Sequence, residues 1–264
     1  MKTLALAAAF AVVSSAALAA DLPTKAPVTT QYVVPAATAP AWAGFYVGVN
    51  AGYGTSTGDQ TIAGADPNGV TAVNLGLVPP GLNTHGGGAL LGATVGYNYM
   101  LNDRVLLGGE ADFDWSGLSG SDGQQISFGP LALDTEGTSK LRWLGTLRGR
   151  AGYLITPTTL LYGTGGLAFG SVESSTAVTL AAPKPFGAQA SADSSSTKLG
   201  WTIGAGVEQQ LASRWSVKAE YQFVDLGSID NSFGAKIGGA IPVNFASHED
   251  LRYHTFRVGL NYHF

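Results

Sequence analysis

The sequence contains no cysteine, which excludes disulfide bonds, thiol catalysis and thiolate metal sites. Charged residues are scarce, at 12% of 264 residues, and a net charge of -4 provides no basic surface for nucleic acid. Outside the N-terminus there is no apolar run of the roughly 20 residues that a membrane-spanning helix needs. A helical membrane protein is therefore excluded, and we expect no nucleic-acid partner.

The residues that are abundant suit many β-strands with belts of aromatic side chains. There are 37 glycines, 10 tyrosines and 5 tryptophans, and 45% of the chain is hydrophobic. The last segment, 256–264, reads FRVGLNYHF and alternates without exception between apolar or aromatic residues and polar or small ones. This period of two predicts an extended strand with one apolar face.

The N-terminus has the pattern of an export signal. Lys2 supplies a positive start, residues 4–18 are apolar or small, and Ala17-Leu18-Ala19 fits the cleavage pattern of a signal peptide. Residues 1–19 are therefore predicted to be removed. Residues 20–41 contain four prolines spaced through alanine and threonine, which predicts an extended periplasmic linker rather than a helix or strand.

Residues 42–264 show eight segments of strand periodicity, although the faces of the fifth cannot be assigned because glycine is too frequent there. The segments are centred on residues 45–53, 89–99, 105–115, 140–153, 160–172, 199–208, 215–223 and 256–264. Short turns alternate with long connections near 54–87, 117–137, 173–197 and 227–250. Such asymmetry is typical of outer-membrane barrels, with short periplasmic turns and long extracellular loops. We predict an all-β fold, an eight-stranded antiparallel transmembrane β-barrel.

The charges predict which face is the lumen. In the seven assignable segments, the aromatic face carries no charge, so it is predicted to contact lipid while the polar face lines the interior. Aromatic residues cluster at both ends of these segments, as two interfacial girdles would require. Because eight strands enclose only enough space for side chains, we expect the inward charges to pair. The predicted network comprises Glu110, Asp112, Asp114, Arg142, Arg148, Arg150, Lys218, Glu220 and Arg257.

Several stretches together resemble one family, the small outer-membrane immunogenic proteins of alpha-proteobacteria, which have an eight-stranded OmpA-like barrel. The matching stretches are ADLP at 20–23, WAGFYVGVNAGYG at 42–54, LRGRAGYL at 147–154, YGTGGLAFG at 162–170, GWTIGAGVEQQL at 200–211 and WSVKAEYQFVDLG at 215–227. The aromatic last strand also resembles the insertion signal of outer-membrane barrels, carried here by Phe256, Val258, Leu260, Tyr262 and Phe264.

The resemblance implies a surface antigen of the bacterial outer membrane with a structural role in the envelope. Its implied partners are outer-membrane lipid, lipopolysaccharide and the barrel-assembly machinery, which would read the last strand. A mature chain that begins with Ala20-Asp21 would also resemble members that are joined to peptidoglycan, if cleavage follows Ala19. The loops carry no pattern of the family, so the resemblance assigns them no function.

Other functions stay open. A small porin or narrow ion channel would use the same inward charges, and a haemin or adhesion receptor would use the loops, with His85, His248, Tyr253 or His254 as candidate haemin ligands. Ser247 lies beside His248, but no nucleophile elbow surrounds it. The four histidines are too dispersed for a metal site. We therefore expect neither catalysis nor a cofactor, with a salt-bridged lumen as the favoured interpretation.

Overall fold

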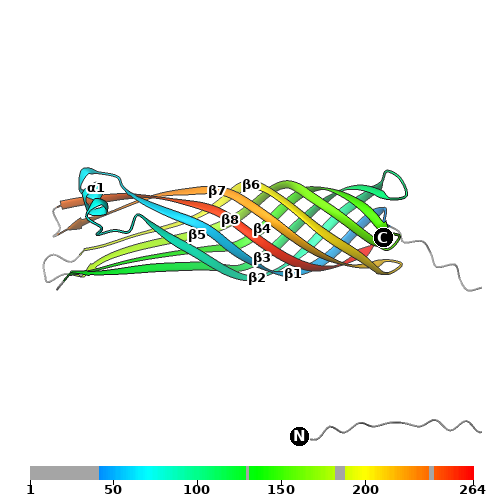
Figure 1. Cartoon of the computed structure of the whole chain (residues 1–264), viewed down its shortest axis with the longest axis horizontal. Helices are drawn as coiled ribbons and strands as arrows, with labels where there is room; N and C mark the ends of the chain where they lie inside the picture. The colour runs from blue at the N-terminus through cyan, green and yellow to red at the C-terminus, as the bar shows by residue number, and fades with distance from the viewer. Residues whose placement is uncertain (1–41, 129–130, 182–187, 238–240) are drawn as a thin grey trace, which may run out of the picture. The chain divides into compact units, whose positions relative to one another are not determined.

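The computed structural model describes residues 42–264, except 129–130, 182–187 and 238–240, and this part forms a closed antiparallel barrel (Figure 1). Each strand pairs with its neighbours in sequence, and β1 closes the ring against β8. The strands are β1 (Gly44–Gly64), β2 (Gly81–Met100), β3 (Val105–Phe128), β4 (Leu131–Thr156), β5 (Thr159–Ala181), β6 (Ala188–Ala212), β7 (Trp215–Ile237) and β8 (Ile241–His263), with one helix, α1 (Pro67–Asn74). The predicted eight-stranded barrel is confirmed. Residues 1–41, which hold the predicted signal peptide and linker, lie outside the described residues.

None of the helical residues in the described ranges forms a segment long and apolar enough to cross a membrane.

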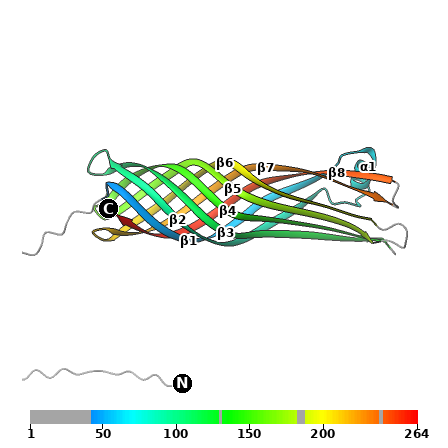
Figure 2. The ribbon, with the colours of Figure 1, turned by 180° about the vertical axis from the view of Figure 1, so that it is seen from behind.

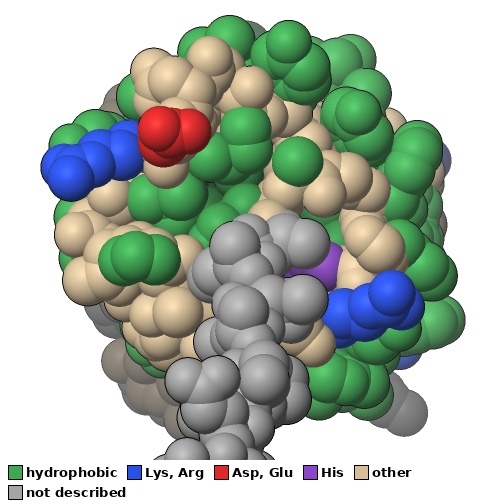
Figure 3. Space-filling view, turned by 90° about the vertical axis from the view of Figure 1, so that its right-hand side faces the viewer, with side chains coloured by type: hydrophobic (Ala, Val, Ile, Leu, Met, Phe, Trp, Pro, Cys, Tyr) green, Lys and Arg blue, Asp and Glu red, His purple; other side chains and the backbone are tan. Residues whose placement is uncertain are grey.

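The half of the barrel that contains the C-terminus and the short turns, called the lower half below, has an apolar outer surface. Strand periodicity turns every second side chain outward there, and large apolar residues such as Leu147 and Phe264 are 58% and 66% exposed. Figure 3 shows this end of the barrel with apolar side chains gathered around its rim. Such an exposed apolar band is what a barrel presents to lipid.

Aromatic side chains gather at both edges of this band. At the end with the C-terminus, Phe45 contacts Tyr97, and Tyr262 contacts both Trp215 and Phe264. At the other edge the contacts are Phe113 with Trp115 and Trp143, Trp143 with Phe169, and Trp201 with Phe223. We call these two sets the lower and the upper girdle.

The predicted long loops at 54–87, 117–137, 173–197 and 227–250 are mostly strand. Each strand has 20 to 26 residues, whereas a tilted strand crosses a membrane with about 9–11. The glycine, serine and threonine of these ranges suggested loops, but alternation continues through them. In β5, for example, Ser174, Thr176 and Val178 are buried while the residue after each is less so. The strands thus extend well beyond the upper girdle.

The extension beyond the upper girdle divides into two sheets. Pairing between β2 and β3 stops at Gly86 and Gly120, and pairing between β6 and β7 stops at Trp201 and Asp225. One sheet is then β7-β8-β1-β2 and the other is β3-β4-β5-β6, and the two diverge toward the end that carries α1 (Figure 2). Apolar residues fill the space between the two sheets. Apolar side chains therefore face inward in the extension, whereas in the membrane band they face outward. This cluster contains Ile62, Val78, Leu82, Val178, Phe233, Val243 and Phe245.

Two irregularities reverse the faces of strands near the upper girdle. The register of β4 shifts between Leu141 and Trp143, so Leu141 is buried while Arg142 points outward. The register of β7 shifts between Asp225 and Ser228, where Gly227 has a φ of 76° that favours glycine. Both shifts lie where the polarity of the interior changes.

Helix α1 covers the tip of the extension. Asp66 caps its first turn by accepting a hydrogen bond from the Gly69 amide at 2.6 Å, and its other oxygen accepts from the Asn244 side chain at 2.7 Å. The Gly69 bond holds the pKa of the Asp66 carboxyl below its ordinary value. Val73 and Ala72 of the helix pack on the apolar cluster of the extension.

If the membrane band is assigned correctly, an arginine on the outer face should destabilise the barrel within the band but not in the extension. Replacing Leu147, midway between Trp143 and Tyr153 on β4, with arginine should destabilise the barrel in lipid vesicles by about 2–4 kcal/mol, because the charge would face hydrocarbon. The measurement is urea unfolding followed by tryptophan fluorescence. The matched control is Thr61→Arg, on the exposed face of the extension, which should change stability by less than about 1 kcal/mol. Equal costs at both positions would contradict the assignment.

Candidate functional site

The candidate site is the charged interior of the membrane band, where strand register brings opposite charges together. Glu110 of β3 pairs with Arg148 of β4, and Glu220 of β7 pairs with Arg257 of β8. All four residues are at most 2% exposed. Neighbouring strands therefore place each carboxylate beside a guanidinium.

Arg148 and Arg257 hold the centre of the network. Arg148 donates to Glu220 at 2.7 Å and to Asp112 at 2.6 Å, and it also contacts Glu110. Arg257 donates to Asp114 at 2.7 Å and to Glu220 at 2.6 Å. Each guanidinium thus joins carboxylates from different strands, an arrangement that its planar set of donors favours.

Lys218 and Arg150 extend the network toward the short turns. Lys218 donates to Glu110 at 3.0 Å, and Arg150 pairs with Glu208. The guanidinium of Arg150 also lies 3.9 Å from the centre of the Tyr162 ring, within the range of a cation–π contact. Glu208 further accepts from Asn261 at 2.8 Å.

Neutral side chains donate to several of the carboxylates, whereas Asp114 Oδ1 is buried without a hydrogen-bond partner among the described residues. The Tyr46 hydroxyl donates to Glu110 at 2.6 Å, and the Tyr162 hydroxyl donates to Glu220 at 3.0 Å. Thr94 donates to Asp112 at 2.6 Å. These bonds matter because an ion pair removed from water is stable only when its other lone pairs are also satisfied.

The structure brings together all of the predicted network except Arg142. That residue points outward because of the β4 irregularity, and its side chain, 58% exposed, pairs with Glu173 at 2.8 Å on the outer surface. Glu208 was missed, although it lies on the polar side of its segment. Its position opposite Lys218 in the β6–β7 register could have identified it.

Apolar clusters lie on both sides of the charges, and the one toward the short turns lies beside buried polar residues such as Asn261 and His263. Toward the short turns, Trp42, Leu106, Leu154, Leu160 and Tyr162 form a buried cluster, and the Trp42 indole donates to the Pro157 carbonyl at 2.9 Å. On the side of the extension, a larger cluster fills the interior. It comprises Leu90, Leu118, Leu141, Leu144, Ala168, Val172, Val224, Leu226, Ile229, Leu251 and Tyr253. Beyond this layer lies the apolar cluster of the extension. Ions crossing the interior would meet the layer around Leu144.

The residues considered for haemin or catalysis do not converge. His248 is exposed and bound to Asp230 at 2.7 Å, which raises the pKa of its imidazole. His254 contacts the Tyr221 hydroxyl on the outer surface, whereas Tyr253 is buried inside. Ser247 is buried and His248 exposed because adjacent residues of a strand face opposite ways. No group of three or more His, Cys, Asp or Glu in the described residues could hold a metal ion.

The remaining predicted residues lie at the two ends of the chain. Phe256, Val258, Leu260 and Phe264 are exposed on the outer face, and Tyr262 lies on the same face in the lower girdle. A role as an insertion signal stays a prediction. Ala20 and Asp21, predicted for attachment to peptidoglycan, lie outside the described residues.

Known proteins resemble the chain along its length. A family model described as "Outer membrane protein beta-barrel domain" matches residues 5–264. The 31 kDa outer-membrane immunogenic protein of Brucella melitensis is 36% identical, and the alignment covers 100% of both chains. The 22 kDa outer membrane protein of Rhizobium leguminosarum bv. viciae is 31% identical over 74% of this chain and 70% of that protein. The crystal structure of OprG from Pseudomonas aeruginosa matches with a TM-score of 0.45 and 12% identity, over 84% of this chain and 96% of that one.

Two arginines of β4 provide a matched test of the network. Arg148→Ala should lower the free energy of unfolding by about 3–5 kcal/mol, because it leaves Glu110, Asp112 and Glu220 short of a buried partner. Arg142→Ala, which removes an exposed pair, should cost about 0–1 kcal/mol. The measurement is urea unfolding in vesicles at neutral pH. Similar losses for the two variants would show that the interior charges are solvated rather than paired.

Proposed function

The chain belongs to the outer-membrane β-barrel family and is related to outer-membrane immunogenic proteins of alpha-proteobacteria, as its motifs predicted, and from this premise we propose that it is a structural surface barrel with a closed lumen. In this proposal the barrel supports the integrity of the envelope and carries an extension above the membrane. It performs no catalysis and takes no cofactor.

The observation that supports a closed lumen is the filling of the interior along its length. A ring of eight strands leaves space only for side chains. Here Arg148 and Arg257 lie buried with their carboxylate partners, and the apolar layer around Leu144 separates them from the extension. A conducting pore would need a continuous polar path, and the apolar layer around Leu144 interrupts one.

The two ends of the barrel support an orientation. Three short connections, at 101–104, 157–158 and 213–214, lie at one end, and the strand extensions with α1 lie at the other. Outer-membrane barrels keep their short turns in the periplasm and their longer segments outside. The extension is therefore the part that faces the surroundings of the cell, in keeping with the names of the immunogenic relatives.

Two further parts of the proposal concern the ends of the chain. The last strand, with Phe264 at its end, would be recognised by the barrel-assembly machinery during insertion. Ala20-Asp21, if exposed by cleavage after Ala19, would attach the N-terminus to peptidoglycan. Both functions follow from resemblance, and each would add to a structural role in the envelope.

A closed lumen predicts that the barrel does not conduct ions across a planar bilayer. Mature protein refolded into planar bilayers should show the heat-dependent gel shift of a folded barrel but no steady single-channel conductance. Removing the apolar layer beside the charges, with Leu141→Ala, Leu144→Ala and Leu226→Ala together, should allow intermittent conductance if the variant still shows the gel shift. The matched control replaces three outward residues of the membrane band, Leu147, Leu161 and Leu167, with alanine and should remain silent.

Steady conductance of the unmodified protein would contradict the closed lumen. If Arg148→Ala then changed the ion selectivity of that conductance, the protein would be a small porin that uses the same charges.

A further inference from the structure

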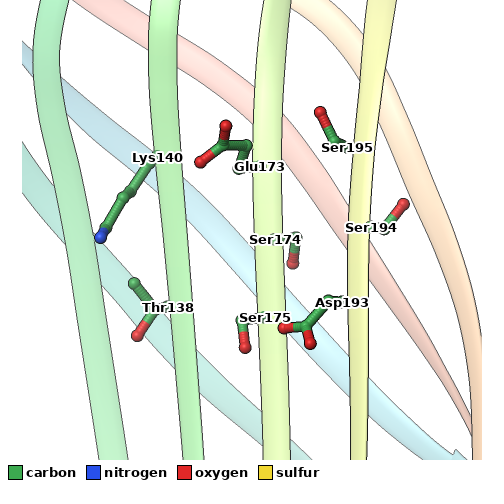
Figure 4. A pocket seen from close by; sticks show the side chains of 8 residues that line it. All are labelled: Thr138, Lys140, Glu173, Ser174, Ser175, Asp193, Ser194 and Ser195. Carbon is green, nitrogen blue, oxygen red and sulfur yellow. The ribbon is translucent and has the colours of Figure 1, made fainter.

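A polar groove lies on the outer face of β4, β5 and β6, beyond the upper girdle. It has a volume of about 330 Å³. The residues that line it, shown in Figure 4, are of polar types: Thr138, Lys140, Glu173, Ser174, Ser175, Asp193, Ser194 and Ser195.

Strand register arranges the outward side chains of the groove in two rows. Lys140, Glu173 and Ser195 are paired across the three strands, and Thr138, Ser175 and Asp193 form the next row. The groove therefore presents one ammonium, two carboxylates and three hydroxyls on a rigid sheet. Rigid placement of polar groups is what a binding site requires.

The irregularity of β4 is what places cations here. Without the shift between Leu141 and Trp143, Lys140 and Arg142 would continue the inward face that carries Arg148 and Arg150. Because of the shift, both side chains point outward, and redirecting side chains is a common effect of β-bulges. Arg142 forms an ion pair with Glu173, whereas Lys140 makes no ion pair with any residue that the structure describes.

The position of the groove indicates what surrounds it. On β5, Glu173 and Ser175 follow the girdle residue Phe169 by four and six residues, which is about 13–20 Å along the strand. The girdle marks the edge of the hydrocarbon. In the proposed orientation, the groove therefore lies among the sugars of the outer leaflet.

We propose that this groove binds the core saccharide of a neighbouring lipopolysaccharide molecule, an inference that rests on the proposed orientation of the barrel. Asp193, Ser175 and Ser195 form hydrogen bonds with sugar hydroxyls, since carboxylates accept and hydroxyls both donate and accept. Lys140 pairs with a phosphate or carboxylate on the saccharide. Such contacts would anchor the barrel laterally to the lipid layer whose integrity it supports.

The test compares binding of three probes to the refolded mature protein in nanodiscs. The probes are purified rough lipopolysaccharide with its core, lipid A without core sugars, and a soluble sulfated polysaccharide. The unmodified protein should retain the core-bearing lipopolysaccharide at least about tenfold more strongly than lipid A. The double variant Lys140→Gln with Asp193→Asn should lose this preference, as expected when charge-assisted contacts are removed.

The matched control is Lys236→Gln with Asp134→Asn, which changes the same residue types at exposed positions elsewhere in the extension and should keep the preference. Equal binding by the double variant and the unmodified protein would overturn the site, and so would equal retention of lipid A. Tighter binding of the soluble polysaccharide than of lipopolysaccharide would also overturn the proposal, because the groove would then serve a glycan from another source.

The gel shift and the bilayer conductance are measured on the same preparations. A folded, silent barrel without saccharide preference would refute the groove and leave the closed lumen intact. A conducting barrel that still selects core-bearing lipopolysaccharide would refute the closed lumen and leave the groove intact.

Discussion

The constraint on which the structure depends is the pairing of every backbone polar group in the absence of water. Within hydrocarbon, a strand cannot leave an edge open, so the sheet must close on itself, as β1 does against β8. Closure with eight strands then fixes the width of the interior. Charged side chains inside such a ring have no room for bulk water and must find partners on other strands. The contacts of Arg148 and Arg257 with four carboxylates are the consequence.

Along each strand, the face that carries apolar residues changes from the outer face in the membrane band to the inner face in the extension. In the membrane band, apolar residues such as Leu147 face lipid and charges face inward, whereas in the extension Ile62 and Val178 face inward. Once a strand leaves the bilayer, water satisfies exposed backbone groups, and the ring no longer needs to be closed. The separation of β2 from β3 and of β6 from β7 occurs in this part of the barrel. The irregularities at Arg142 and Gly227 lie near the boundary between the membrane band and the extension.

The membrane band could be predicted from sequence because period two identifies both faces of a strand. The inward charges, among them Glu220 and Arg257, could be identified because they lie on the polar faces of their segments. The extension could not be predicted, because serine, glycine and threonine occur in loops as often as in strands exposed to water. Arg142 was misplaced because one extra residue reverses the face of a strand, and no residue type marks such a bulge. The groove around Lys140 was invisible for the same reason.

The central claim is that the interior of the barrel is closed to small ions from both sides. Because the chain has no cysteine, a single cysteine at Asn50, which is 3% exposed among the inward residues, reports access to the interior without background. A small cationic thiol reagent is applied to both sides of vesicles that contain the folded protein, and modification is followed by mass spectrometry. The account predicts that Asn50→Cys stays unmodified until the barrel is unfolded, while Thr61→Cys on the exposed extension reacts at once. Rapid modification of the folded Asn50→Cys variant would show that the lumen is open and would contradict the account.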